Sequence, residues 1–151
     1  MEDIIKSGEQ APEFTLYDQN GMAVSLQELR GKKVLLSWHP LAWTGVCTDQ
    51  MRLLERNYQR LAEKNIVALG ISVDPQPSKA AWAKVLCLSE LKILADFYPL
   101  GQVTKAYGVF SSEYGASKRA NVLVDESGKV IWSKKYEIKT LPDVEEILAQ
   151  A

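Results

Sequence analysis

Cysteine and histidine, the residues that build most disulfide scaffolds and zinc sites, are scarce in this sequence. Its 151 residues include two cysteines, Cys47 and Cys87, and one histidine, His39. Two cysteines are too few for the disulfide framework of a small secreted domain, and they form no Cys-x-x-Cys pair that could hold zinc. We therefore expect no metal site and no cofactor. Chemistry at a free thiol remains open.

An excess of charge of one sign is also missing. Lys and Arg number 18 and Asp and Glu number 19, so the formal net charge is -1. A nearly neutral chain has no basic field for a nucleic-acid backbone or an anionic membrane surface, so we expect neither partner. No apolar run approaches the roughly 18 residues of a membrane span, and residues 1–6 contain no apolar signal core. We expect one cytoplasmic domain over residues 1–151.

What the sequence does contain is an alternation of strand and helix patterns. Apolar runs at 34–38 and 66–73 predict buried strands, and a helix is predicted between them, from an N-cap at Thr44 to about residue 64. These form a βαβ unit with parallel strands and a right-handed crossover. The first part of the chain adds a small hairpin, with a strand at 14–17 and a turn at 18–21, and a short helix at 25–31. The other predicted elements are a helix from about 78, a strand near 93–94, a helical turn at 102–107, a hairpin of 121–124 with 129–132, and a last helix from about 142 to 151. The fold class is α/β, with a thioredoxin-like mixed central sheet and helices on both faces.

Cys47 begins the apolar face of the predicted helix after the first strand. At helical spacing it shares that face with Met51, Leu54, Tyr58 and Leu61. In the first turn of a helix, free amides and the positive end of the dipole favour a thiolate over a thiol. The alternative is a small apolar residue at the top of the core. The flanking Pro40, Thr44 and Gly45 favour the reactive interpretation.

Residues 40–47, Pro-Leu-Ala-Trp-Thr-Gly-Val-Cys, resemble the Pro-x-x-x-Thr-x-x-Cys signature of the peroxiredoxins, the AhpC/TSA family. The segment lies between a predicted strand and a predicted helix, where that family places it. The resemblance extends along nearly the whole chain, through Ala-Pro-Glu-Phe-Thr-Leu at 11–16, Asp-Phe at 96–97, Ala-Tyr-Gly-Val at 106–109 and Arg-Ala-Asn-Val-Leu-Val-Asp at 119–125. Asn121 and Leu123 depart from the family pattern. Residues 94–99 and 107–110 are most similar to the alkyl hydroperoxide reductase E type.

The resemblance implies a thiol-dependent peroxidase that acts on hydrogen peroxide and organic hydroperoxides without a cofactor. Cys47 would be the peroxidatic cysteine, which becomes a sulfenic acid. Thr44 would hydrogen-bond the peroxide and the sulfur, Pro40 would shield the thiolate from water, and Arg119 would supply a fixed positive charge. Such donors are required because negative charge passes onto the departing oxygen.

Two features near this predicted site leave alternatives open. Where the family often has a glutamate, this sequence has Gln50, whose amide can accept from Arg119 without adding charge; Asp49 is an alternative partner. Arg119 follows Lys118, and a Lys-Arg pair before a strand is commonly a solvated turn. His39 either pairs with Cys47 or has a loop-packing or subunit-contact role. The remaining aromatic predictions place Trp43 as a pocket wall or subunit contact, and Trp82 and Trp132 in the core.

Cys87 is the possible resolving cysteine. It faces away from the predicted apolar stripe of its helix, which comprises Ala81, Trp82, Val85 and Leu86. A sulfenic acid condenses with a thiol, so three routes are open: an intramolecular disulfide of Cys47 with Cys87, a disulfide between subunits, or an external thioredoxin-, glutaredoxin- or other thiol-type reductant. A disulfide between two helices requires local unwinding. The resemblance further implies a homodimer packed through the active-site loops.

Two other function classes compete with a peroxidase. A disulfide reductase with this fold would need a Cys-x-x-Cys motif, which is missing. A non-catalytic thioredoxin-like binding or chaperone module would have no need of Thr44, Cys47 and Arg119 together. Their co-occurrence favours the peroxidase.

Overall fold

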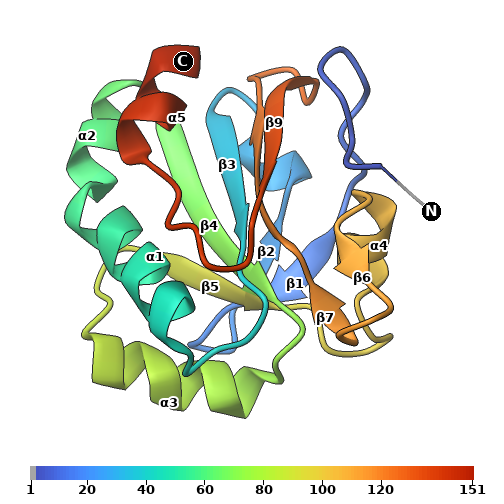
Figure 1. Ribbon diagram of the computed structural model, residues 1–151. Coiled ribbons are helices and arrows are strands. Elements are labelled where there is room, and N and C mark those ends of the chain that lie inside the picture. Colours follow the sequence, from blue (N-terminus) through green and yellow to red (C-terminus); the bar gives the residue numbers. More distant parts are fainter. Residues whose placement is uncertain (1–2) are drawn as a thin grey trace.

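A computed structural model describes residues 3–151 and is built around a seven-stranded mixed sheet of strand order β2-β1-β5-β4-β3-β8-β9 (Figure 1). Its strands are β1 (Thr15–Tyr17), β2 (Ala23–Ser25), β3 (Lys33–Trp38), β4 (Ile66–Ser72), β5 (Lys92–Ala95), β8 (Arg119–Val124) and β9 (Val130–Tyr136). Strands β3, β4 and β5 are parallel, and the other pairs are antiparallel. A separate ribbon pairs β6 (Phe110–Ser111) with β7 (Ala116–Ser117).

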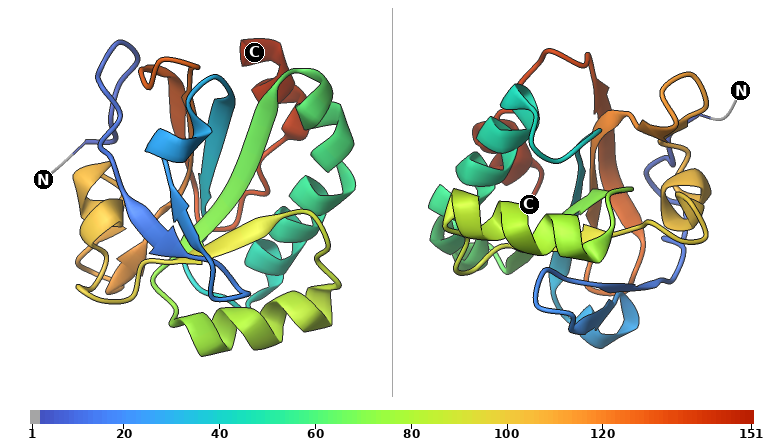
Figure 2. Two further views of the ribbon diagram at one scale, coloured as in Figure 1. Left: turned by 180° about the vertical axis from the view of Figure 1, so that it is seen from behind. Right: turned by 90° about the horizontal axis from the view of Figure 1, so that it is seen from below.

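Helices cover both faces of the sheet, which confirms the predicted fold class. They are α1 (Gly45–Arg56), α2 (Tyr58–Glu63), α3 (Gln76–Leu86), α4 (Gln102–Ala106) and α5 (Val144–Gln150), with a 3₁₀ turn, η1 (Gln27–Leu29). Figure 2 shows α1, α2, α3 and α5 on one side of the sheet and α4 on the other. Within residues 3–151, no helix combines the length and the apolar character needed to cross a membrane.

The alternation of side chains along β3 supplies both cores. Leu36 and Trp38 join the cluster under α4, whereas Leu35 joins the cluster under α1, α2, α3 and α5. Both faces of this central strand are therefore buried, as its largely apolar sequence predicts. Cys47 belongs to the second cluster, so the reactive-sulfur candidate is anchored in a packed core.

The register of the central strands places the site. Trp38, the last residue of β3, lies opposite Ile71 of β4 and Ala120 of β8. Because β8 runs antiparallel to β3, its first residue, Arg119, emerges at the edge where the chain leaves β3. Residues 39–47 and Arg119 therefore meet at one end of the sheet.

Two predicted helices are shorter in the structure than the pattern indicated. The single helix predicted over 45–64 is wrong, because Asn57 separates α1 from α2 with φ -102° and ψ 10°. Its side-chain amide donates to the Leu53 carbonyl at 2.8 Å, which competes with the helical backbone bonds. The predicted helix at 25–31 is only the single turn η1, although the Ser25 hydroxyl still accepts from Glu28 N at 3.2 Å.

The predicted stripe of α3 is wrong in two of its four members. Trp82 and Leu86 are buried, but Ala81 is exposed and Val85 is 58% exposed. The buried face is made instead by Lys79, Trp82, Ala83 and Leu86. Because a lysine rarely lies in a core, the prediction from apolar residues left Lys79 out. The predicted buried face is therefore rotated about the helix axis relative to the observed one. The helix also begins two residues earlier than predicted, with a proline in its first turn.

Candidate active site

Cys47 lies in the first turn of α1 and is 1% exposed. Thr44 occupies the N-cap position as predicted, and its carbonyl accepts from Thr48 N at 2.9 Å. Its hydroxyl does not cap the helix but donates to the Leu41 carbonyl at 2.8 Å. The loop before the helix is thus closed by a bond within itself, and the first-turn amides stay free of a side-chain cap.

Arg119 contacts the sulfur of Cys47. Its Nη1 lies 3.4 Å from Cys47 Sγ and donates to Gln50 Oε1 at 2.6 Å. Nε and Nη2 both donate to the Ile138 carbonyl, at 3.1 Å and 2.9 Å. The residue is 3% exposed, so the interpretation of Lys118 and Arg119 as a solvated turn is wrong for Arg119. The guanidinium is thus bound by Gln50 on one side and by the Ile138 carbonyl on the other, and its positive charge lies next to the Cys47 thiol.

Gln50 is the residue that orients Arg119 on the α1 side. Its Nε2 donates to Ser37 Oγ at 2.7 Å and to the Trp38 carbonyl at 3.2 Å, both on β3. With its nitrogen held by β3, the amide must turn its oxygen toward Arg119. Asp49 is exposed and makes no bond to Arg119, so the alternative partner is excluded.

Pro40, Thr44, Cys47 and Arg119 line one cavity of about 600 Å³. The rest of its wall is largely apolar and includes Leu41, Val46, Tyr114 and Ile138. The structure therefore brings together the four residues predicted for peroxide chemistry. Sequence reasoning missed Ile138 and Tyr114. Ile138 acts through its backbone carbonyl, which any residue supplies, so no side-chain pattern could have identified it.

Cys87 is outside this cavity. It is exposed and follows α3 directly, in the left-handed conformation with φ 57°. Just beyond it, Ser89 Oγ and Leu91 N donate to the Glu55 carboxylate, at 2.9 Å and 2.8 Å. Glu55 is eight residues after Cys47 on α1, which corresponds to about 12 Å along a helix axis. The two cysteines are free and lie toward opposite ends of α1.

His39 does not pair with Cys47. It is fully buried, and its Nε2 lies 2.9 Å from Lys79 Nζ. Burial, followed by the charges of Lys79 and Arg119, holds the pKa of His39 well below its usual value. The ring is therefore neutral at physiological pH and packs inside the loop, which rules out a subunit contact.

Three of the four tryptophans were assigned positions from the sequence. Trp43 is 52% exposed and donates to Ser78 Oγ at 3.1 Å, so it links the loop to α3 rather than forming a wall of the cavity. Trp82 lies in the core as predicted, whereas Trp132, also predicted in the core, is only partly buried and packs against the core cluster under α1, α2, α3 and α5. In residues 3–151, no three or more His, Cys, Asp or Glu side chains are grouped to hold a metal ion.

Comparison with known proteins agrees with this geometry. A model of the AhpC/TSA family matches residues 7–133. Alkyl hydroperoxide reductase E from Mycobacterium tuberculosis is 40% identical over 126 residues, which cover 83% of this chain and 82% of that protein. The putative peroxiredoxin bcp of Haemophilus influenzae is 35% identical over 139 residues, covering 87% and 88%.

Solved structures give the same result for the fold. The crystal structure of peroxidoxin BcpB from Mycobacterium tuberculosis is similar at a TM-score of 0.85 and 26% identity, covering 97% of this chain and 96% of that one. A reduced 2-Cys peroxiredoxin from Plasmodium vivax has a TM-score of 0.85 at 29% identity, with 94% and 78% covered. The resemblance and the thioredoxin-like fold predicted from the sequence are thereby confirmed. This chain belongs to the AhpC/TSA family of peroxiredoxins.

Proposed function

We propose that the chain is a thiol-dependent peroxidase that reduces hydrogen peroxide and organic hydroperoxides at Cys47. The Cys47 thiolate attacks the terminal oxygen of the hydroperoxide, so a sulfur–oxygen bond forms as the oxygen–oxygen bond breaks. The cysteine is oxidised to a sulfenic acid, and the departing hydroxide or alkoxide takes up a proton to leave as water or alcohol. Relatives named alkyl hydroperoxide reductase, peroxiredoxin and thiol peroxidase support this reaction class.

The contact between Arg119 Nη1 and Cys47 Sγ carries the proposal. A buried guanidinium stabilises the thiolate before attack and the charge that develops on the departing oxygen during attack. The Thr44 hydroxyl donates its hydrogen to the Leu41 carbonyl. The hydroxyl oxygen of Thr44 is therefore free to accept a hydrogen bond from the incoming hydroperoxide. Pro40, which has no N–H, lines the same cavity and keeps water from the sulfur. The apolar remainder of the wall fits the organic part of an alkyl hydroperoxide.

The second half of the cycle needs a thiol. The sulfenic acid of Cys47 condenses with it, releasing water and forming a disulfide, and a further thiol reduces that disulfide. Cys87 is exposed and so available for an intramolecular disulfide, but its place beside the far end of α1 requires the first turn of α1, the end of α3, or both to unwind. An external thioredoxin-, glutaredoxin- or other thiol-type reductant requires only that Cys47 becomes accessible.

Intact mass under denaturing, non-reducing conditions tests both halves of the proposal. The protein is treated with one equivalent of hydrogen peroxide, with Cys47→Ser and Cys87→Ser as matched variants. A loss of two hydrogens in the wild type that is absent from Cys87→Ser establishes the intramolecular disulfide. A gain of one oxygen without a disulfide assigns the second step to an external thiol. An unchanged mass in the wild type, or peroxide turnover that persists in Cys47→Ser, would defeat the peroxidase assignment.

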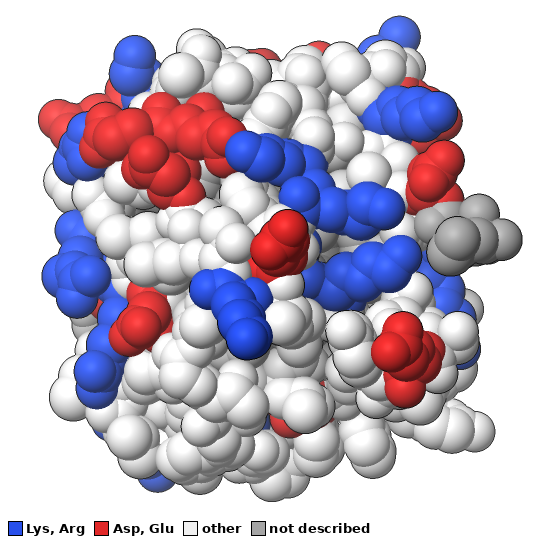
Figure 3. Space-filling model, viewed as in Figure 1, with Lys and Arg blue, Asp and Glu red and all other residues white. Residues whose placement is uncertain are grey.

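The surface around the cavity supports a homodimer. Large apolar side chains are exposed there, namely Leu41, Trp43, Tyr114 and Ile138. On the face drawn in Figure 3, charged side chains of both signs are interspersed and gather above a mostly uncharged lower part. An apolar surface next to a site is typical of an interface. Analytical ultracentrifugation checks this assembly: Trp43→Glu is expected to shift a dimer toward the monomer, and a wild type that is monomeric at all concentrations would contradict it.

A further inference from the structure

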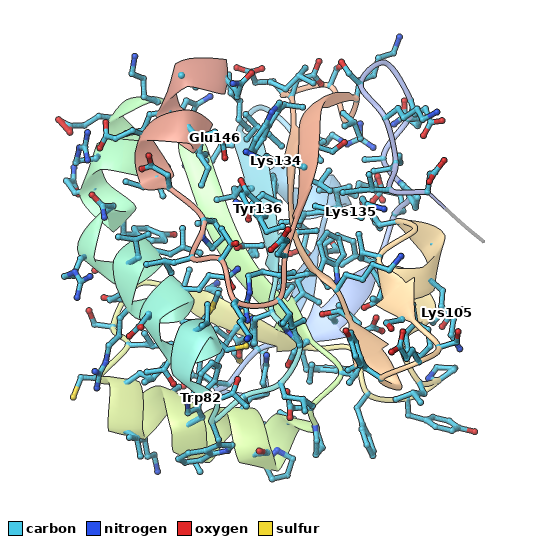
Figure 4. The ribbon with its side chains drawn as sticks, in the orientation of Figure 1. Trp82, Lys105, Lys134, Lys135, Tyr136 and Glu146 are labelled. Carbon is cyan, nitrogen blue, oxygen red and sulfur yellow. The ribbon has the colours of Figure 1, made fainter. Side chains whose placement is uncertain are left out.

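Lys79 is a completely buried lysine that the reaction described so far does not use. It is 0% exposed on the inner face of α3, where its Nζ lies 2.9 Å from His39 Nε2 and donates to Ser72 Oγ at 2.6 Å. The ammonium also lies 5.9 Å from the ring centre of Trp82, which Figure 4 places on α3. A buried charge is costly unless it is paired. A fully buried lysine with specific hydrogen-bond partners therefore suggests a function for this side chain.

The partners of Lys79 lead into the active-site loop. Ser72 Oγ, which accepts from Lys79, donates in turn to Asp74 Oδ2 at 2.6 Å. The same carboxylate oxygen accepts from Ala42 N at 2.8 Å. Ala42 lies between Pro40 and Thr44, so this chain of bonds holds the middle of the segment that shapes the cavity. His39, the other partner of Lys79, is the first residue of that segment.

The charges around Lys79 decide where the proton resides. His39 after β3 and Ser72 at the end of β4 contact its ammonium, and the charges of Asp74, two residues after Ser72, and of Cys47 on α1 act on it from further away. Arg119 on β8 acts on the pair through His39. The pair cannot carry two positive charges at 2.9 Å in a buried site, and the low pKa of His39 leaves the proton on Lys79.

The negative charges near Lys79 favour its ammonium form. Burial lowers the pKa of Lys79 to about 7, while the negative charges of Asp74 and Cys47 oppose that shift. As pH rises through about 7, Lys79 loses its proton, and its hydrogen bonds with His39 and Ser72 lose the charge that strengthens them.

We propose that Lys79 is a positioning residue of the peroxidase site. Its ammonium, bound by His39 and Ser72, holds residues 39–44 in the conformation that surrounds the sulfur of Cys47. The inference rests on the proposed function, because it concerns how fast Cys47 reacts with a hydroperoxide.

Substitution of Lys79→Met tests the proposal, with Lys84→Met as the matched control on the exposed face of α3. Both are made in the Cys87→Ser background, so that Cys47 is the sole thiol. Stopped-flow fluorescence follows the oxidation of Cys47 by hydrogen peroxide between pH 6 and pH 9. In Lys79→Met the rate is expected to be about ten-fold lower at pH 6, where wild-type Lys79 is charged. Toward pH 9 the two rates converge, because wild-type Lys79 is then neutral too.

A purely structural role would not produce this pH dependence. An equal loss of rate at every pH, or an unchanged rate at pH 6 in a folded Lys79→Met protein, would overturn the proposal. Ser72→Ala provides the test if Lys79→Met does not fold, because it removes one partner of the ammonium and should lower the rate at pH 6 by a smaller factor. An unchanged rate at pH 6 in that variant would equally overturn it. If the parent protein fails to react with peroxide at any pH, the proposed function fails instead.

Discussion

At the scale of single residues, the site depends on the Arg119 cation, which is positioned by the uncharged side-chain amide of Gln50. Gln50 connects Arg119 to β3 and uses all of its polar atoms to do so. Arg119 is thus positioned without a carboxylate near the sulfur, and its charge remains available to the thiolate.

Removing this cation should slow the chemical step. Arg119→Ala is expected to raise the barrier to Cys47 oxidation by about 2–4 kcal/mol, comparable to the loss of a preorganised donor to a developing oxyanion. Stopped-flow measurement of single-turnover oxidation checks this, with Lys118→Ala as the neighbouring control. A rate for Arg119→Ala within two-fold of the wild type would remove the residue from the site.

Restoring the carboxylate common in the family should be harmful in this chain. In Gln50→Glu the nitrogen that donates to Ser37 and Trp38 becomes an oxygen, which would face the Trp38 carbonyl without a hydrogen. We expect a loss of about 1–3 kcal/mol of stability at pH 7, the usual cost of a buried unsatisfied polar contact. Urea unfolding measures it. A Gln50→Glu protein as stable as the wild type would show that the loop can adapt.

The site residues that belong to a short sequence motif could be predicted from the sequence. Those whose role depends on burial and tertiary contacts could not. Pro40, Thr44 and Cys47 lie within eight residues, and Arg119 begins a recognisable strand. Lys79 could not be identified, because a lysine in an amphipathic helix is assigned to solvent by pattern alone. The Ile138 carbonyl and the orientation of Gln50 depend on tertiary contacts that leave no signal in local sequence.

At the scale of elements, the strands follow their apolar runs closely, and the helix ends do not follow the patterns as well. β3 and β4 were predictable because strands buried on both faces have short, continuous apolar sequences. The division of α1 from α2 was not, because it depends on one side-chain bond at Asn57. α5 is fixed on β9 by Glu146, which binds Lys134 and Tyr136, and Figure 4 shows the three close together.

The carboxylate of Glu55 fixes the segment after Cys87 to α1. Burial raises the pKa of Glu55, but hydrogen bonds from Leu91, Ser89 and Glu90 lower it below its ordinary value. A depressed pKa stabilises the fold above the unfolded-state pKa of about 4.3, and the contribution is lost as pH falls through the folded-state pKa. Glu55→Gln is therefore expected to cost about 1–2 kcal/mol at pH 7 and progressively less in acid. Urea unfolding against pH checks this, with Glu63→Gln as the exposed control; a cost independent of pH would contradict it.

At the scale of the whole molecule, the fold buries the Cys47 sulfur, which a second thiol must later reach. Cys47 is packed in the core below α1, and Cys87 lies at the surface beside the far end of the same helix. An intramolecular disulfide would therefore require the first turn of α1, the end of α3, or both to unwind once Cys47 is oxidised. An external thiol would require only that Cys47 becomes accessible.

Hydrogen exchange on peroxide-treated protein should reveal this opening. If Cys47 bonds Cys87, amides in 44–48 and 86–90 are expected to exchange about ten-fold faster or more than in the reduced protein. Amides of β3 and β4 should remain protected, and Cys87→Ser should show no change near residue 87. Disulfide formation with unchanged exchange in both segments would show that the cysteines meet without unwinding.

The neutral side chain at Gln50 has a further consequence for the charge of the buried site through the cycle. Below about pH 7, where Lys79 keeps its proton, the reduced site holds two cations, Arg119 and Lys79, and two anions, Asp74 and the Cys47 thiolate of the proposed reaction. Conversion of the thiolate to an uncharged sulfenic acid leaves one positive charge without a counterion. A glutamate at position 50 would cancel it, whereas the amide does not. The oxidised site is therefore an anion receptor, and the anion it is suited to attract is the thiolate that completes the turnover.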